Sequence, residues 1–589
     1  MPKIEISKHD VEKLIGHKIN EKEIDDLLAY AKGEHEGTVG DTITVDCKDT
    51  NRPDLWCAEG IARQIAGGLG KAKGVPQYTV NKSDYLVRVD PNLKGIRPRT
   101  ACAVVKGIKI TDDVLKQIIQ MQEKVAGTFG RNRREAAIGV YDFDKIQWPI
   151  RYMGFHPDKL KFTPLEMSRE LTLRQILGQH PKGREFAHLL ESYKLYPVFI
   201  DADKNVLSMP PVINSNYSGK VTEDTTNLFI EVSGFEDRFV HTALNSMIAS
   251  LADRGGKIYE VNVKYGLSEK LSCPDFRPKK IKVPLGLFNY LSGLGLSTKE
   301  LLDLLHKARL NAQVSGENIL VEYPSYRIDI MHSVDVVEDA LVAYGFNNIE
   351  PIVPELAVEG SETELEVFSR RIREYLVGFG AQEISTYTLT NKDKLFNRMK
   401  LNSPKLATSQ SKIQMHVTAS KCVEIANPVS QNWSVLRNWL IPSIVEFLGN
   451  NTTQEYPQAI FEVGEVVIPN PKAETMSDTI RRLVFAVAHK NANFTEIKQI
   501  LQALLHGLEV EFEVAEVEHN SFIPGRVGII KIKGANESKI RGATKSHDLV
   551  GKEIGIIGEL HPAVLKNWRL ENPVVLFELD VNKLLTLLK

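Results

Sequence analysis

Cysteine is scarce in this chain: there are five among 589 residues, and none of them forms a C-x-x-C pair. Zinc fingers and dithiol redox motifs need such pairs, and a disulfide-built domain needs many more cysteines. Both classes of protein are therefore excluded. We expect all five to be small buried side chains in a reducing compartment, namely Cys47, Cys57, Cys102, Cys273 and Cys422.

Net charge and long apolar runs are also lacking. The 74 lysine and arginine residues are matched by 75 aspartates and glutamates, which leaves a formal charge of −1. This balance excludes a protein drawn to nucleic acid by its overall field, although it permits local basic patches. No apolar run approaches the roughly 20 residues that cross a bilayer, and residues 1–16 carry charges where a signal peptide would be apolar. We expect a cytoplasmic protein without membrane contact.

What the chain does have is the composition of a soluble globular protein, with 42% hydrophobic and 25% charged residues. At roughly 100–200 residues per domain, its length predicts about three to five domains. The spacing of apolar residues distinguishes four segments that each mix strand-like and helix-like stretches. We predict a multidomain α+β protein built from residues 1–84, 85–272, 273–352 and 353–589.

A turn is expected in the first segment, at residues 51–54, because Pro53 disfavours helix at Arg52. We predict that Asp54 caps a helix which ends at Gly67 and Gly68. The run GGLGK that follows does not have the spacing of a phosphate-binding loop.

The clearest chemical signal is a cluster of carboxylates in the third segment. Three of them share one side of a predicted helix that Ser333 would cap, with an apolar stripe at Val334, Val337, Leu341 and Tyr344. The cluster consists of Asp329, Asp335, Glu338 and Asp339. Oxygen ligands of this kind suit Mg²⁺ or Ca²⁺. Equally, acidic residues are favoured in a first helical turn, where Arg327 would partly neutralise them. Spacing alone leaves both interpretations open.

The same region, YRIDIMHSVDVVEDALVAYGFNNI, resembles the metal-binding module of the phenylalanyl-tRNA synthetase beta subunit. Further matches follow the family's order along the chain. NRPDLWCAEGIARQIAG resembles the N-terminal domain, and VLSMPPVINS the editing domain. NPVSQNWSVLRNWLIPSIVEFLGNN, IFEVGEVV and GIIGELHPAVL resemble the C-terminal synthetase-like domain. The chain resembles the shorter archaeal and eukaryotic form, because the additional bacterial domains find no room in it.

The resemblance implies a fold and a ligand set. It implies an N-terminal α/β domain, a mixed α/β editing domain, a winged-helix-like metal module and a class II synthetase-like antiparallel-sheet domain without catalytic motifs. It also implies that Asp329, Asp335, Glu338 and Asp339 coordinate Mg²⁺.

Adenylation is not expected in this chain. Class II enzymes bind ATP with an arginine–glutamate pair, but Arg437 has no glutamate two residues on, and we expect it to hold structure at a domain or subunit contact. The resemblance assigns ATP and the aminoacyl-adenylate to a separate alpha subunit, in an (αβ)₂ assembly that charges tRNA(Phe).

The editing domain is where the resemblance implies chemistry within this chain, the hydrolysis of tRNA(Phe) mischarged with tyrosine. In the strand-like run NLFIEVSG, alternation places Phe229, Glu231 and Ser233 on one face, as a ring contact, a phenol acceptor and a hydroxyl. Ser208, Asn214 and Ser215 are further candidates around the ester. Without the resemblance, a partly exposed strand with ordinary polar residues is the simpler interpretation.

Two other functions remain open at this point. One is a tRNA-binding and assembly scaffold whose editing pocket is inactive. The other is a free-standing Mg²⁺-dependent hydrolase that uses the carboxylate cluster. Arg131, Arg133 and Arg134 are candidates for contact with the tRNA backbone, although a solvated basic turn is the more frequent outcome for such a run.

Overall fold

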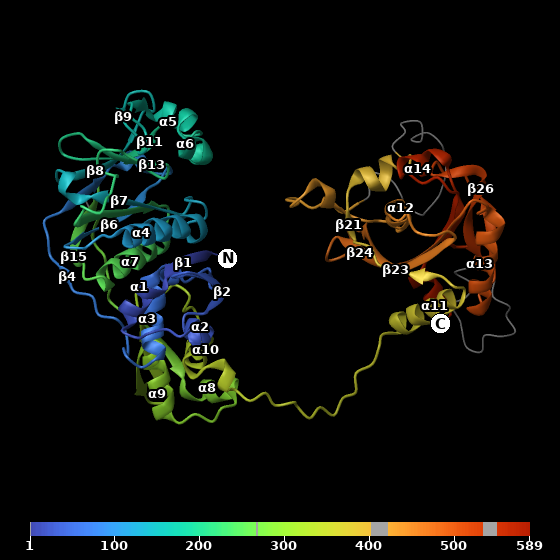
Figure 1. The fold of residues 1–589 in the computed structure, drawn as a ribbon, viewed down its shortest axis with the longest axis horizontal. Coiled ribbons are helices and arrows are strands. Elements are labelled where there is room, and N and C mark those ends of the chain that lie inside the picture. The colour runs from blue at the N-terminus through green and yellow to red at the C-terminus, as the bar shows by residue number, and fades with distance from the viewer. Residues whose placement is uncertain (1, 267–268, 402–421, 534–550, 589) are drawn as a thin grey trace. The chain divides into compact units, whose positions relative to one another are not determined.

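The computed structural model describes residues 2–266, 269–401, 422–533 and 551–588. These residues form two compact units, Met1–Val353 and Pro354–Lys589, and each is described by itself. The ribbon of both is shown in Figure 1. In the described part of the chain, no helix has the length and apolar character needed to cross a membrane.

The first unit begins with a small α/β layer. Its sheet has the order β1-β3-β2, and the elements are β1 (Lys3–Ser7), α1 (Lys8–Ile15), α2 (Ile24–Ala29), β2 (Gly33–Val39), β3 (Thr42–Cys47) and α3 (Ala58–Gly68). Ser7 caps α1 by accepting from the backbone N–H of Asp10. The prediction that Asp54 caps α3 is wrong, because α3 begins at Ala58 with Cys57 as its cap, while Asp54 lies in a 3₁₀ turn and pairs with Arg52.

An eleven-stranded sheet forms the middle of this unit. Nine strands follow the order β13-β12-β11-β8-β5-β15-β6-β14-β7, and β4 and β16 pair with β15. The strands are β4 (Val80–Asn81), β5 (Leu86–Val89), β6 (Arg99–Lys106), β7 (Ala136–Asp142), β8 (Ile150–Phe155), β11 (Tyr196–Ile200), β12 (Val206–Met209), β13 (Ile213–Asn214), β14 (Asn227–Gly234), β15 (Lys257–Tyr265) and β16 (Glu269–Cys273).

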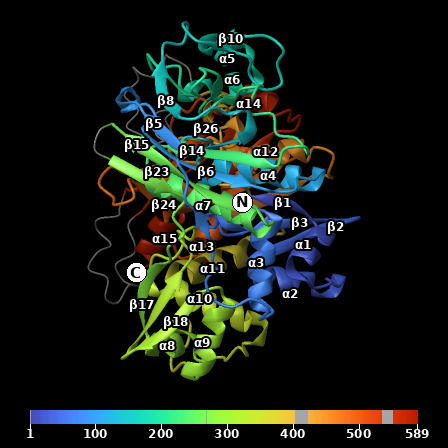
Figure 2. The ribbon, with the colours of Figure 1, turned by 90° about the vertical axis from the view of Figure 1, so that its left-hand side faces the viewer.

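Strand β14 lies between two antiparallel neighbours, β6 and β7. Residues Leu228–Gly234 are all buried, so the interpretation as a partly exposed strand is wrong. Helix α7 (Asp237–Asp253) packs on β6 and β14, and α4 (Asp112–Lys124) packs near β7. Figures 1 and 2 show α5 (Leu173–Gln179) and its neighbour α6 (Pro181–Phe186), together with the β9 (Lys161–Phe162)–β10 (Leu171–Thr172) pair, at one end of the unit.

The other end of the first unit is a three-stranded module of order β17-β19-β18. It contains β17 (Lys279–Pro284), α8 (Leu285–Ser292), α9 (Thr298–Lys307), β18 (Asn311–Ser315), β19 (Asn318–Tyr323) and α10 (Ser333–Tyr344). Two predictions for α10 are wrong. Its cap is His332 rather than Ser333, and its buried face contains Val336 while Val334 is exposed.

The second unit is built on a seven-stranded sheet of order β20-β23-β24-β28-β27-β26-β25, antiparallel except for the β20–β23 pair. Its main strands are β20 (Gln382–Glu383), β23 (Gln458–Pro469), β24 (Ser477–Ala488), β25 (Phe512–Glu516), β26 (Phe522–Ile532), β27 (Glu553–Leu560) and β28 (Val574–Asp580). A short pair, β21 (Leu389–Thr390) and β22 (Val435–Leu436), lies apart from it. The helices are α11 (Glu364–Gly378), α12 (Ile441–Asn450), α13 (Phe494–Gly507), α14 (Pro562–Asn567) and α15 (Val581–Leu587).

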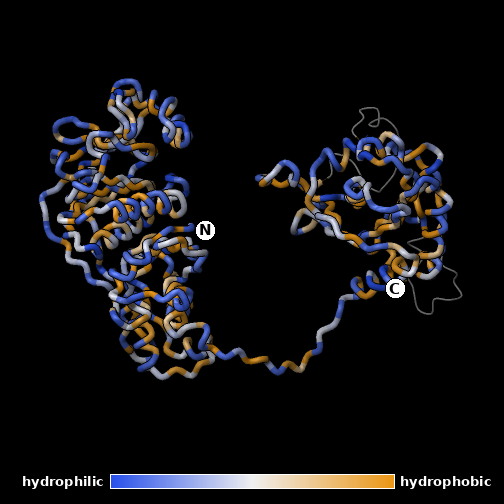
Figure 3. The backbone as a smooth tube through the Cα atoms, in the orientation of Figure 1, coloured by the Kyte–Doolittle hydropathy of each residue, from blue (hydrophilic) through white to orange (hydrophobic). Residues whose placement is uncertain are grey.

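Both faces of this sheet are buried. Along β24, Val484 and Ala486 belong to one hydrophobic core, whereas Leu483 and Phe485 belong to the core on the opposite face. A strand covered on both sides is hydrophobic throughout rather than alternating. Hydrophobic stretches accordingly run through the sheet of this unit (Figure 3). The predicted multidomain mixture of α and β structure is confirmed.

Candidate functional site

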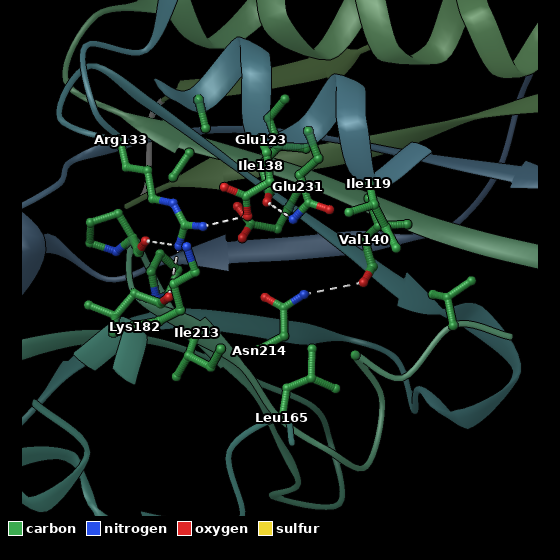
Figure 4. Close-up of a pocket in the computed structure, with 18 of the residues that line it drawn as sticks. Ile119, Glu123, Arg133, Ile138, Val140, Leu165, Lys182, Ile213, Asn214 and Glu231 are labelled. Atoms are coloured by element: carbon green, nitrogen blue, oxygen red, sulfur yellow. Dashed lines mark hydrogen bonds and ion pairs between the residues drawn. The ribbon is translucent and has the colours of Figure 1, made fainter. Parts of the chain in front are cut away.

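A cavity of about 490 Å³ opens in the first unit between α4, the strands β7 and β14, and the loop before β13. Much of its wall is aliphatic, with Leu115, Ile118, Ile119, Ile138, Val140 and Ile213 among the lining residues. Figure 4 shows α4 above the cavity and Ile213 and Asn214 below it. An apolar pocket with few polar groups is the usual form of a site for a small organic group.

Glu231 is the acidic residue that β14 contributes to this cavity. It is 2% exposed, and its Oε1 accepts a hydrogen bond of 3.1 Å from the Tyr141 hydroxyl on β7. Its Oε2 has no hydrogen-bond partner among the described residues. Burial raises the pKa of Glu231 to about 8, although the bond from Tyr141 and the charge of Arg97 act in the opposite direction. The carboxyl group is therefore mainly neutral at pH 7.

Gly139 makes room for this pair. It lies directly opposite Glu231 in the β7–β14 register. A Cβ atom at position 139 would lie 2.2 Å from the Tyr141 hydroxyl oxygen and 2.7 Å from Glu231 Oε1. Any side chain there would displace one of the two groups.

Arg133 holds the wall of the cavity in place. It follows Arg131 and Asn132, and all three have positive φ angles, of 50°, 53° and 64° in order. Its guanidinium donates to the carbonyl oxygens of Pro211 (3.2 Å) and Val212 (2.9 Å) and pairs with Glu123 at 2.7 Å. The guanidinium also lies 4.2 Å from the ring centre of Phe186.

Arg133 is thus neither a solvated turn residue nor an open phosphate contact. Its contacts with the loop before β13 can be followed in Figure 4. Left-handed backbone at non-glycine residues is costly and persists where the surroundings hold it.

The structure places the five predicted pocket residues differently from one another. Glu231 and Asn214 line the cavity, and Asn214 Nδ2 donates to the carbonyl oxygen of Val140 at 3.3 Å. Ser208 is buried and pairs with Asn214 in the β12–β13 register. Ser233 accepts from Arg97 Nε at 3.0 Å and Ser215 from the backbone N–H of Tyr217 at 3.0 Å, and neither lines the cavity.

Sequence reasoning missed Tyr141, Gly139 and the wall role of Arg133. The run AAIGVYD carried a usable signal, because strand alternation places Gly139 and Tyr141 on one face. Phe229, expected as a ring contact, packs instead against Tyr141 and Trp148 and is not part of the lining.

The carboxylate cluster has basic partners. Arg327 pairs with Asp329 and donates to Asp339 at 2.8 Å. Lys32, from the N-terminal layer, lies 3.1 Å from Glu338 and 3.6 Å from Asp339. Asp335 accepts from the backbone N–H groups of Met331 (2.8 Å) and His332 (2.6 Å).

Arg52 joins the N-terminal layer to the same cluster. It donates to Asp54 through Nε (2.9 Å) and Nη2 (2.8 Å) and lies 3.9 Å from Asp329. Although burial raises the pKa of Asp329, the Arg327 and Arg52 guanidiniums hold it below its usual range. Buried charges of opposite sign thus connect the three-stranded module to the N-terminal layer.

This arrangement does not fit a bound cation as it stands. Across the described ranges, no group of three or more histidine, cysteine or acidic residues is spaced to hold a metal ion. Oxygen donors suit Mg²⁺, but Arg327 and Lys32 already contact three of the four carboxylates. The assignment of Mg²⁺ to Asp329, Asp335, Glu338 and Asp339 stays a prediction.

Arg437 in the second unit is buried, with 2% exposure. It was expected at a domain or subunit contact, and it lies instead inside its own unit, paired with Glu462.

Comparison with known families gives these features a context. The family model described as "B3/4 domain" matches residues 85–263, which include the cavity, and "tRNA synthetase B5 domain" matches 281–346, which include the carboxylate cluster. "Phenylalanyl tRNA synthetase beta chain CLM domain" matches 349–581. Together they define a subunit of an aminoacyl-tRNA ligase.

Similar proteins extend over the whole chain. The phenylalanine–tRNA ligase beta subunit of Pyrococcus horikoshii is 46% identical over 588 residues, covering 99% of this chain and 100% of that protein. The beta subunit of Methanosphaera stadtmanae is 34% identical over 585 residues, covering 99% and 100%. A crystal structure of an N-terminal fragment of the Pyrococcus horikoshii beta subunit has a TM-score of 0.57 and 47% identity, covering 59% of this chain and 100% of the fragment. The chain belongs to the phenylalanine–tRNA ligase beta subunit family.

Proposed function

We propose that the cavity hydrolyses tRNA(Phe) mischarged with tyrosine, while the chain supports phenylalanine charging by an alpha subunit. The observation that carries the proposal is Glu231, a buried carboxyl group without a cationic partner among the described residues, in a largely aliphatic pocket. The aliphatic wall suits an aromatic ring, and the carboxyl group suits its hydroxyl.

A synthetic site alone does not separate phenylalanine from tyrosine well enough, and a second, hydrolytic site corrects this. An apolar pocket that accepts phenylalanine rejects an added hydroxyl by only about 10²-fold. A site built to hydrogen-bond that hydroxyl discriminates in the opposite direction, because phenylalanine would leave a buried polar group unpaired. Glu231 is the candidate for this contact, with Asn214 nearer the ester and Ser208, Ser215 and Ser233 supporting the surrounding strands.

The pocket contains no serine–histidine–aspartate arrangement among its described lining residues. The ribose hydroxyl of the terminal nucleotide then helps to activate the attacking water. The residues of this chain position the ester and exclude bulk water from the ring.

We assign the remaining parts by the same family relationship. Residues 1–84 form the N-terminal domain, 85–272 the editing domain, 273–352 a winged-helix-like module and 353–589 a class II-like core without catalytic motifs. ATP is bound by the alpha subunit in a cytoplasmic (αβ)₂ assembly.

The test uses the chain co-purified with its alpha subunit. Tyrosyl-tRNA(Phe) hydrolysis and phenylalanine charging are measured on the same sample. We expect Glu231→Ala to abolish hydrolysis and to preserve charging, whereas Glu191→Ala, at an exposed position outside the cavity, changes neither. Hydrolysis that survives Glu231→Ala would reject the pocket assignment, and a wild-type complex without hydrolysis would favour the scaffold function.

A further inference from the structure

We propose that the pocket offers a hydrogen-bond donor to the substrate hydroxyl. Glu231 works as a neutral acid, and Tyr141 is the positioning residue whose bond to Oε1 leaves only Oε2 of Glu231 free. The inference rests on the proposed function for the identity of the substrate. It concerns how the contact is made, and it replaces the acceptor that the sequence suggested with a donor.

The first step is the bond between the two side chains. The Tyr141 hydroxyl donates to Oε1 at 3.1 Å, and burial raises the pKa of Tyr141 well above its usual value, so the phenol keeps its proton. An oxygen that accepts from Tyr141 behaves as the carbonyl oxygen of a neutral acid. The acid proton then lies on Oε2, which has no hydrogen-bond partner among the described residues.

The second step is the absence of a cation that would ionise Glu231. No lysine or arginine forms an ion pair with it in the described part of the chain, and an isolated buried carboxylate is strongly unfavourable. The charge of Arg97 acts to lower the pKa of Glu231, but its guanidinium donates to Ser233 Oγ and to the carbonyl oxygen of Arg134, each at 3.0 Å.

The remaining groups within the sheet around Glu231 are uncharged side chains. Within the sheet they are Cys102 on β6, Tyr141 on β7, Tyr152 on β8, Ser208 on β12 and Ser233 on β14. On the cavity side the charged lining residues are Glu123, Arg133, Glu166, Lys182 and Lys220, of which Glu123 and Arg133 pair with each other. Among the described residues, none of these lining cations forms an ion pair with Glu231.

A neutral Glu231 recognises a phenol by donating a hydrogen bond to it. Oε2–H donates to the oxygen of a bound phenol, while a phenylalanine ring leaves this donor unpaired. A lost bond of this kind costs about 10-fold to 100-fold in binding. Ionisation of Glu231 would replace the donor by a carboxylate that can only accept, and a bound ring would have to cover that charge in an apolar pocket. Recognition should therefore weaken as the pH rises through about 8.

The test is the pH dependence of tyrosyl-tRNA(Phe) hydrolysis by the assembled complex. Glu231→Gln keeps a donor and cannot ionise, so we expect it to stay within about threefold of wild type at pH 7. Dividing the hydrolysis rate of the wild type by that of Glu231→Gln cancels the intrinsic effect of pH on the ester. This ratio of rates should fall above about pH 8. Glu231→Gln as inactive as Glu231→Ala at pH 7, or a ratio independent of pH, would overturn the inference.

Tyr141→Phe tests the positioning role. Loss of its hydrogen bond removes an influence that lowers the pKa of Glu231, so the midpoint of the ratio should move to higher pH. KM should rise more than kcat falls, because the acid is present but free to rotate. If the pH midpoint of the rate ratio does not change, and KM and kcat are affected equally, Tyr141 has only a structural role.

Difference infrared spectroscopy of wild type against Glu231→Gln separates this inference from the proposed function. A protonated-carboxyl band at pH 7 that disappears above about pH 8 supports the neutral acid, even if the complex proves unable to hydrolyse its substrate and the proposed function fails. An ionised carboxylate at pH 7 overturns the inference, even in an active enzyme.

Discussion

Arg437 and Glu462 form a buried ion pair in the second unit, with 2.8 Å between Nη2 and Oε1. The same guanidinium donates to Thr386 Oγ1 (2.6 Å) and to the carbonyl oxygen of Glu465 (2.9 Å). Each of the three guanidinium nitrogens thus donates to a group of the protein itself, rather than to a phosphate. This arginine holds three parts of one fold together.

The ion pair predicts a large cost for removing one partner. Arg437→Leu leaves Glu462 buried without its cation, which typically costs about 3–5 kcal/mol. Urea denaturation of the chain should show this loss in the transition of the second unit. Removing both charges, with Arg437→Leu and Glu462→Leu together, should cost less than Arg437→Leu alone, and a larger cost would contradict the pairing.

The isolated chain should show no ATP–pyrophosphate exchange. Arg437 is engaged, and we assign adenylate formation to the alpha subunit. Adding the alpha subunit should restore phenylalanine-dependent exchange. Exchange by the chain alone, after removal of traces of the partner, would contradict the assignment.

Arg327 should be a major contributor to the stability of the first unit. Arg327→Ala leaves Asp329 and Asp339 buried without this partner, and we expect a loss of about 3–5 kcal/mol in unfolding free energy. The matched control is Arg277→Ala, because Arg277 is 89% exposed and pairs with Asp275 at the surface. This control should leave the unfolding free energy nearly unchanged, because exposed ion pairs contribute little. Equal effects would show that burial of the cluster is unimportant.

Mg²⁺ binding to the carboxylate cluster should be opposed by Lys32. A cation reaches Glu338 and Asp339 only if Lys32 releases them. We therefore expect Lys32→Met to bind Mg²⁺ at least about tenfold more tightly than wild type in calorimetric titrations, and Glu338→Gln to reverse the gain. If the wild type binds Mg²⁺ more tightly than Lys32→Met, the prediction is wrong, and the carboxylates rearrange around the ion while Lys32 stays in place.

Gly139→Ala should damage the pocket selectively. Its Cβ would lie 2.2 Å from the Tyr141 hydroxyl oxygen, so Tyr141 and Glu231 must separate. We expect loss of tyrosyl-tRNA hydrolysis with charging retained, and a destabilisation of about 1–3 kcal/mol. Gly178→Ala is the control, since nothing lies within 4 Å of a Cβ at that helical position. Full hydrolysis in Gly139→Ala would contradict the close fit.

Several elements were predictable because their cause is local. Ile4 and Ile6 alternate into the core of β1. The alternation of β14 predicted one face with Phe229, Glu231 and Ser233, of which Glu231 lines the cavity. Helix caps were less predictable. Asp54 and Ser333 are both good capping residues, yet Asp54 pairs with Arg52, and the cap of α10 is His332, so that Ser333 is its first helical residue.

The sequence by itself determined the family and the mixture of α and β structure, because these depend on motifs and on spacing along the chain. Only the tertiary structure decided which groups meet. Tyr141 reaches Glu231 across 90 positions, and Lys32 lies beside Glu338 through the packing of two separate parts of the first unit. Whether a buried carboxyl group is neutral or paired depends on those long-range neighbours, and no local pattern records them.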